Sequence, residues 1–129
     1  MPDSKNTTTD EADRTLAKRF HELVTGEKLY LQGDLDLWKV SKLLETNRNY
    51  LSRAINRRFG KTFSTIINEW RVDESLRVMR DEIRLTVDEI ARRSGFNDRR
   101  SFFRIFKRAK GMAPSEYREK IANHKSVKP

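Results

Sequence analysis

Apolar side chains recur at steps of three and four residues along most of the chain, which is the spacing of one face of an α-helix. The apolar positions of the first such run, from Glu11 to Gly26, are Leu16, Phe20, Leu23 and Val24. Residues 1–10 are polar and aperiodic, so we expect a disordered tail or linker there. Because no segment alternates apolar and polar residues as a β-strand does, the pattern predicts an all-α fold of about seven helices.

Two short helices and one long helix are predicted after Gly26. Asp36 and Asn47 each precede a helical run and can cap it through a side-chain oxygen. The inward positions expected after Asp36 are Leu37, Val40, Leu43 and Leu44, and Trp38 is expected to join the core. The helix after Asn47 ends at Gly60, and the longest helix follows over residues 63–80.

Three further helices are predicted in the last third of the chain. Residues 86–89, TVDE, match a capping box, in which Thr86 accepts from the third helical amide and Glu89 reaches back. Gly95 then turns the chain, and Pro114 suits the first turn of the last helix. The inward side of the helix between them comprises Phe102, Ile105, Phe106 and Ala109.

The second half of this pattern repeats the first. Leu51, Arg53, Ile55 and Gly60 recur 51 positions later as Phe102, Arg104, Phe106 and Gly111. Each block is a short helix, a tight turn and a basic amphipathic helix, which is a helix-turn-helix arrangement. The expected organisation is a first helix-turn-helix subdomain over 11–60, a connecting helix over 61–81, a second subdomain over 82–124 and a frayed tail at 125–129.

The charge balance is strongly basic and narrows the choice of partner. The chain of 129 residues has a formal net charge of +9, which indicates a polyanionic partner. It has no cysteine, which excludes disulfides and thiolate metal sites and fits a reducing compartment. No apolar run approaches the roughly 20 residues that a transmembrane helix needs, so the expected location is the cytoplasm.

The basic residues gather on the outer face of the second helix of each block. Over residues 47–59 this face carries Arg48, Asn49, Ser52, Arg53, Asn56 and Arg57. Over residues 98–109 it carries Arg99, Arg100, Phe103, Arg104 and Lys107. Arginine and asparagine match guanine and adenine edges in the DNA major groove. Since the charges are nearly all of one sign, pairing within each helix cannot neutralise them, and we predict that both faces bind double-stranded DNA.

Phe103 is the one aromatic residue among these arginines. Its ring can fold over the edge of the core, or it can contact the C5-methyl group of thymine in the major groove. The sequence leaves both interpretations open.

Residues 90–118, IARRSGFNDRRSFFRIFKRAKGMAPSEYR, resemble the signature of AraC/XylS-type transcription regulators. The shared features are the I-A before the turn, the G-F within it, F-x-R-x-F-K and G-x-x-P-S-E-Y-R. With the upstream segment NYLSRAINRRFGKTFSTIINEWRV, the resemblance covers about two-thirds of the chain, from Leu35 to Arg118. It implies two helix-turn-helix units, each with its second helix in the major groove, joined by a rigid helix. A connecting helix of about 18 residues is roughly 27 Å long, so we expect the recognition helices in successive major grooves.

The resemblance also assigns roles to individual positions. Asn49, Ser52 and Arg53 match positions that face bases or nearby phosphates in the first unit, and Arg99, Arg100, Phe103 and Arg104 match them in the second. Glu45 departs from the family because a turn glycine is frequent there, and this implies strain of roughly 1 kcal/mol. Ser41 departs because a small apolar residue is usual at its position.

The resemblance extends to partners and context. The lead-in GEKLYLQGDLDLWKVSKLL is similar to a branch in which the DNA-binding domain ends a longer chain with a membrane-embedded sensory part. We therefore expect a C-terminal fragment that lacks an N-terminal sensory or membrane region, located at the cytoplasmic end of such a regulator. RNA polymerase is a further expected partner, and neither a metal nor a cofactor is expected.

Two other classes of function compete with DNA recognition. An enzyme is disfavoured because His21 and His124 have no carboxylate at a repeated spacing, and because no glycine-rich phosphate loop occurs. A non-specific basic module that binds nucleic acid or an anionic surface is the remaining alternative. RNA modules display aromatic residues on sheets or loops, whereas the aromatic residues of this chain follow the helical core pattern.

Overall fold

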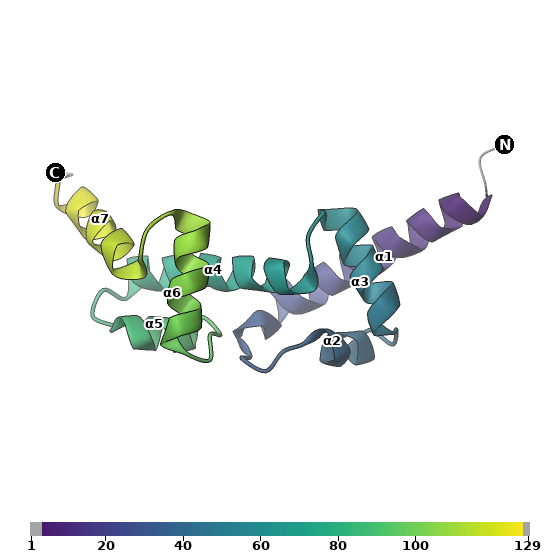
Figure 1. Cartoon of the computed structure of the whole chain (residues 1–129), viewed down its shortest axis with the longest axis horizontal. Helices are drawn as coiled ribbons and strands as arrows, with labels where there is room; N and C mark the ends of the chain where they lie inside the picture. The colour runs from purple at the N-terminus through teal and green to yellow at the C-terminus, as the bar shows by residue number, and fades with distance from the viewer. Residues whose placement is uncertain (1–3, 128–129) are drawn as a thin grey trace. The chain divides into compact units, whose positions relative to one another are not determined.

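The computed structural model describes residues 4–127 of the chain, and it describes side chains for residues 9–123. Within this range the chain forms seven α-helices and one short 3-10 helix and contains no β-strand (Figure 1). The predicted all-α fold is therefore confirmed. Contacts divide the chain into two compact units, Met1–Ile67 and Asn68–Pro129, so the division falls within the predicted connecting helix.

The first unit is built on its long initial helix. Its elements are α1 (Ser4–Gly26), η1 (Leu29–Leu31), α2 (Leu37–Leu43), α3 (Arg48–Phe59) and the start of α4 (Phe63–Asp81). α1 packs against α3, and the fully buried residues of these two helices are Ala17, Phe20, Val24, Leu51, Ala54 and Ile55. The Phe20 ring also meets the rings of Phe59 and Phe63, at centroid distances of 6.4 and 5.9 Å. This packing holds one side of α3 against α1.

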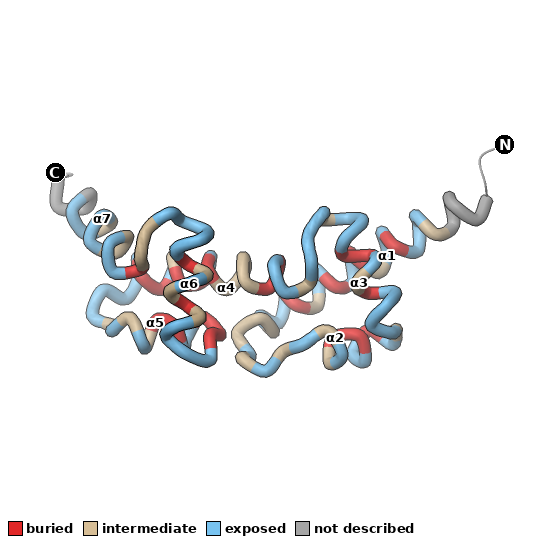
Figure 2. Tube along the Cα trace, in the orientation of Figure 1, coloured by how far each residue is buried: buried red, intermediate tan, exposed pale blue. Residues whose placement is uncertain are grey.

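The second unit is built around three aromatic rings. Its helices are the remainder of α4, then α5 (Val87–Arg93), α6 (Arg99–Lys110) and α7 (Pro114–Val127). The Phe102 ring lies 5.0 Å from that of Phe96 and 5.5 Å from that of Phe106. Ile90 of α5 and Met79 of α4 are buried in the same cluster. Buried segments of α4, α5 and α6 are visible in Figure 2, where each helix turns one side to this core.

Caps begin and end the helices of the first unit where the sequence predicts them. Asp36 accepts a hydrogen bond of 2.8 Å from the Lys39 amide at the start of α2. Asn47 accepts one of 2.8 Å from the Tyr50 amide at the start of α3. Gly60 ends α3 in the left-handed region at φ 68°, a conformation that glycine adopts without strain.

The predicted capping box at the start of α5 forms only in part. The Thr86 hydroxyl oxygen accepts from the Glu89 amide at 3.1 Å, as expected. The Glu89 carboxylate, however, accepts from the Thr86 hydroxyl group at 3.1 Å instead of from the Thr86 amide. The hydroxyl group can do both because it is a donor and an acceptor at once.

The terminal helices extend further than the apolar pattern predicts. α1 begins at Ser4, so residues 4–10 continue the helix instead of forming a tail. α7 ends at Val127, within the stretch 125–129 that is predicted to fray. Once a packed nucleus exists, polar residues add to a helix at little cost, and this extension carries no apolar signal. The first three and last two residues lie outside the described range.

Three side chains expected in the core are exposed. Trp38 is 49% exposed and Leu43 is 60% exposed, and Ala109 at the end of α6 is exposed as well. The buried residues of α2 are Val40 and Ser41, and its C-cap residue Leu44 is buried as well. Each residue turns an α-helix by about 100°, so Trp38 and Leu43 lie on the flanks of so short a helix. The Trp38 ring is instead covered by the Lys42 ammonium group, 4.3 Å from the ring centroid.

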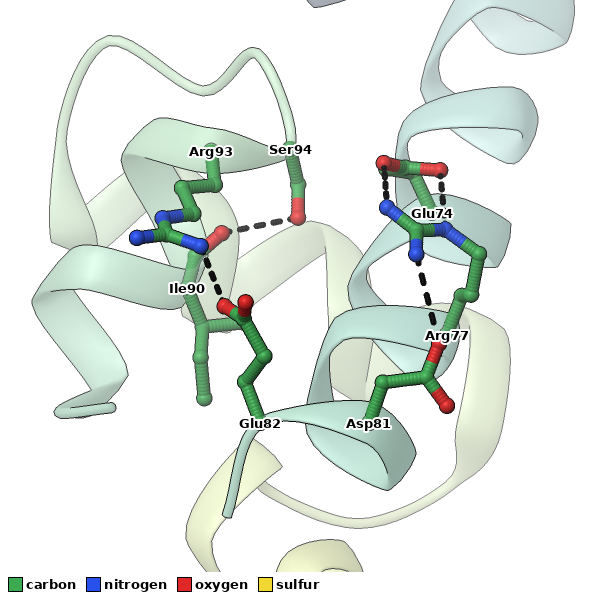
Figure 3. Close-up of polar contacts among 7 residues, drawn as sticks. All are labelled: Glu74, Arg77, Asp81, Glu82, Ile90, Arg93 and Ser94. Carbon is green, nitrogen blue, oxygen red and sulfur yellow. Dashed lines mark hydrogen bonds and ion pairs between the residues drawn. The ribbon is translucent and has the colours of Figure 1, made fainter. Parts of the chain in front are cut away.

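Buried hydroxyl groups are satisfied by the backbone. Ser41, where a small apolar residue is usual, donates from its hydroxyl group to the Trp38 carbonyl at 2.8 Å. Ser94 donates to the Ile90 carbonyl at 2.7 Å (Figure 3). Because these bonds are made within one helical turn, a buried serine is tolerated at both positions.

Candidate nucleic-acid interface

The outer face of α3 carries all six residues that the sequence predicts for the first unit. Arg48, Asn49, Arg53, Asn56 and Arg57 are exposed, and Ser52 is half-buried. α3 itself contains no acidic residue. Basic residues in its last turn, Arg57 and Arg58, lie where the helix dipole is negative.

Two arginines of this face contact α1, and the sequence pattern does not predict that contact. The Arg53 Nε atom lies 3.5 Å from Asp13 Oδ1, and Arg57 Nη1 donates to Asp13 Oδ2 at 3.3 Å. Arg57 Nη1 also lies 3.9 Å from Asp10 Oδ1. Only 7% of the Asp13 side chain is exposed, whereas the arginine side chains are 43% and 54% exposed. The α3 arginines thus reach both a buried carboxylate and the solvent.

The outer face of α6 carries all five residues predicted for the second unit. Arg99, Arg100, Arg104 and Lys107 are exposed, and Phe103 is half-buried. α6 also lacks acidic residues, and its last turn is basic. Arg99 of this face makes an ion pair with α5, in which its Nε atom lies 3.6 Å from Asp88 Oδ1. Both groups of that pair are exposed, so it is weak.

Phe103 lies between the core and the arginines. It packs against the buried cluster of the second unit. On its other side the Arg99 guanidinium lies 5.2 Å from the centroid of its ring, a cation–π contact. The core interpretation is therefore supported, and the partial exposure of Phe103 leaves the predicted contact with thymine a prediction.

A carboxylate fixes the start of α6. Asp98 accepts from the Ser101 amide at 2.7 Å and from the Ser101 hydroxyl group at 3.2 Å. The hydrogen bond from the Ser101 amide, followed by that from the hydroxyl group, lowers the pKa of Asp98 below its ordinary value of 3.8. Asp98 occupies the position that Asn47 occupies in α3, so both candidate recognition helices begin with a side-chain cap.

Ion pairs hold the segment that leads into the second helix-turn-helix motif. Arg93 of α5 pairs with Glu82, which follows α4 (Figure 3). Within α4, the Arg77 guanidinium lies between Glu74 and Asp81, with Nη2 2.6 Å from Glu74 Oε2 and Nη1 3.3 Å from Asp81 Oδ2 (Figure 3). The Arg77 pairs lie within α4, and the exposed Arg93–Glu82 pair is the one of these contacts that joins α5 to the segment after α4.

Asp13 is the residue of this region that the sequence prediction lacks. A signal was available, because Asp13, Ala17, Phe20 and Val24 follow the helical steps of four, three and four. A carboxylate in the inward stripe of a helix requires a cationic partner, since an unpaired buried charge is costly. The identity of that partner depends on tertiary packing and could not be predicted.

The described residues offer neither a metal site nor a membrane-spanning helix. Residues 9–123 contain no group of three histidine or acidic side chains that could hold a metal ion. None of the helices within the described part of the chain is long and apolar enough to cross a membrane.

Comparison with known proteins gives one family match and several relatives. A family model described as a helix-turn-helix domain matches residues 40–120. The uncharacterized transcriptional regulatory protein YesN of Bacillus subtilis is 31% identical over 84 residues, which are 64% of this chain and 23% of YesN. The uncharacterized HTH-type transcriptional regulator YtdP of the same organism is 24% identical over 119 residues, which are 92% of this chain and 15% of YtdP. The chain therefore spans less than a quarter of the length of either relative.

Two solved structures are similar over most of the chain. The C-terminal domain of AraT, a response regulator from Geobacillus stearothermophilus, superposes with a TM-score of 0.74 at 29% identity, covering 81% of this chain and 84% of that one. The DNA-binding domain of AdpA, a global transcriptional factor in complex with a target DNA, gives a TM-score of 0.75 at 20% identity. That match covers 84% of this chain and 96% of the AdpA domain, and it shows a shared fold.

Proposed function

The chain belongs to the AraC-type helix-turn-helix family, and from this premise we propose that it is the sequence-specific, double-stranded DNA-binding domain of a transcription regulator. α3 and α6 are its recognition helices. Each enters a major groove with its basic outer face. The relative AdpA, whose domain has the same fold, is in complex with a target DNA.

One observation carries this proposal. Two helices of 12 residues are each free of acidic residues, and each follows a short helix and a tight turn. α3 exposes arginines and asparagines to solvent, and α6 exposes arginines and lysines. Arginine donates to guanine O6 and N7, and asparagine pairs with adenine N6 and N7. A helix face that is only solvated usually mixes acidic and basic residues, whereas the outer faces of α3 and α6 carry one sign of charge.

Finer features follow from the same proposal. The two recognition helices occupy successive major grooves. The DNA sequence that they bind therefore has two half-sites about 10 base pairs apart. We propose RNA polymerase as a second partner, no catalytic activity for the domain, and the cytoplasm as its location.

Selection of bound duplexes from a random library tests the proposal, with footprinting of the selected duplex as the second step. We expect a recurring motif and two protected patches about 10 base pairs apart. A single protected patch would mean that one of the two units does not recognise bases. Recovery of random sequences would favour the alternative of a non-specific basic module.

A further inference from the structure

The two units differ in how their arginines are held. At the offset of 51 residues, Arg53 and Arg57 of α3 correspond to Arg104 and Arg108 of α6. The first two share the buried Asp13 of α1. Arg104 interacts electrostatically with the exposed Asp98 at the start of its own helix, and no buried carboxylate among residues 9–123 pairs with Arg104 or Arg108. The carboxylate is therefore a feature of the first unit and not of the repeated motif.

The contact with Asp13 constrains how Arg53 presents its guanidinium group. The contact between Arg53 and Asp13 is made at Nε, 3.5 Å from Oδ1, so we infer that the two terminal nitrogens face away from the carboxylate. These terminal N–H groups are the fork that binds a guanine edge or a phosphate in a bidentate manner. The centroid of the Tyr50 ring lies 5.4 Å from the guanidinium carbon of Arg53, so an aromatic ring also restricts where the guanidinium group can lie. We infer that Arg53 is held at Nε by Asp13 and that its two terminal nitrogens remain available to bind DNA.

The other oxygen of Asp13 is anchored by Arg57. Because the Asp13 carboxylate is almost completely buried, loss of either arginine contact would leave its charge poorly compensated, which favours both contacts. α1 makes a further contact with the motif, in which Arg19 Nη2 donates to the Leu44 carbonyl at 3.1 Å. Leu44 is the C-cap of α2 and the first residue of the turn, so α1 contacts both the turn and the recognition helix of this unit.

We propose that Asp13 is a positioning residue for DNA recognition by the first unit. Its carboxylate orients the Arg53 guanidinium so that the terminal nitrogens meet one base pair, and Arg57 completes the anchor. A group that acts in this way sets the discrimination at one base position without contacting DNA. This inference rests on the proposed function, since it assigns a specificity role within the same interface.

The test is base preference, measured by selection from a random duplex library with the wild-type chain and its variants. Asp13→Asn removes the charge but nearly keeps the shape, and Asp13→Glu keeps the charge but changes the reach. We expect both to lower discrimination at one position of the first half-site by roughly 5- to 150-fold and to leave the second half-site unchanged. Glu11→Gln is the matched control because it makes the same change of charge on the exposed side of α1, and it should keep the full preference.

Arg53→Lys makes the test independent of how well the Asp13 variants fold. It keeps a positive charge opposite Asp13 but lacks the fork, so it should relax the same base position. Wild-type preference at every position in folded Asp13 variants, or in Arg53→Lys, would overturn the inference alone. Failure of the wild-type chain to select any sequence would overturn the proposed function, and this inference with it.

Discussion

The ring of Phe103 meets the buried ring of Phe102 edge to face, with centroids 6.5 Å apart and an interplanar angle of 85°. Phe102 is fully buried, whereas Phe103 is half-buried with Arg99 over its outer side. Two consecutive phenylalanines of α6 are therefore buried in the core to different extents. The outer one is partly exposed beside the arginines of α6, and its contact with DNA is a prediction.

Alanine substitution should separate these two roles. Phe102→Ala should lower the free energy of unfolding by roughly 3–5 kcal/mol because it empties a core site. Phe103→Ala should lower it by about 1–2 kcal/mol, because only part of the ring is buried, and should relax selection at one base position. Urea unfolding and duplex selection measure the two effects, with Phe103→Leu as an apolar control. Unchanged base preference in Phe103→Ala would assign Phe103 to the core alone.

The turns of the two motifs provide a second matched pair. Glu45 and Gly95 are 50 positions apart, each follows the short helix of its unit, and both have positive φ, 56° and 92°. A side chain is strained in this region by roughly 1–2 kcal/mol. Glu45→Gly relieves this strain but also increases the conformational entropy of the unfolded chain, which opposes the gain. The net result should be a free energy of unfolding that is higher by up to about 1 kcal/mol.

Gly95→Ala should have the opposite effect and lower the free energy of unfolding by about 1–2 kcal/mol. Thermal and urea unfolding of both variants provide the measurement. Lys28→Gly, at φ 52°, is an independent case for which the same sign as Glu45→Gly is expected. Destabilisation by Glu45→Gly would mean that the turn is not strained.

The cap of α6 predicts a pH dependence. The pKa of Asp98 is lower in the folded protein than its ordinary value of 3.8, because the charged form accepts the hydrogen bonds of Ser101. The stabilisation is therefore complete above that ordinary value and is lost as pH falls through the folded-state pKa. Asp98→Asn keeps a cap but cannot titrate.

Urea unfolding of the wild type and Asp98→Asn from pH 7 down to pH 3 and below measures this difference. We expect the stability of the wild type to fall more steeply with decreasing pH than that of the variant. Glu119→Gln, an exposed position on α7, controls for the loss of a carboxylate. A constant difference between wild type and Asp98→Asn over the whole range would contradict the assigned role.

A phosphate contact by Lys107 should be visible in the salt dependence of binding. Lys107→Gln should weaken binding to all duplexes alike and reduce the magnitude of the log–log salt slope by about 0.9, the value for one phosphate. Lys120→Gln removes the same charge from an exposed position on α7 and should leave the slope unchanged. Equal slopes for Lys107→Gln and the wild type would remove Lys107 from the DNA contacts.

Local signals in the sequence predicted much of the fold. Asp36 and Asn47 lie at helix starts and Gly60 at a helix end, because caps depend on hydrogen bonds within a few residues. The basic outer faces of α3 and α6 were predictable for a similar reason, because helical spacing alone places their basic residues on one side of each helix.

Features that depend on contacts between distant residues were not predictable. Trp38 was expected in the core and is exposed, because a helix of two turns buries only the residues that its neighbours cover. The role of Asp13 depends on the packing of α1 against α3, which brings together residues more than 40 positions apart. Charge-pair partners of this kind are set by tertiary structure.

The most direct test of sequence-specific recognition compares two affinities. The Kd of the chain for its selected duplex is measured beside that for a shuffled duplex of the same length and composition, at about 150 mM salt. Specific binders discriminate by at least about 10³-fold, and we expect a ratio of that order here. Equal affinity for the two duplexes, or equal competition by single-stranded DNA and anionic vesicles, would contradict sequence-specific recognition of double-stranded DNA.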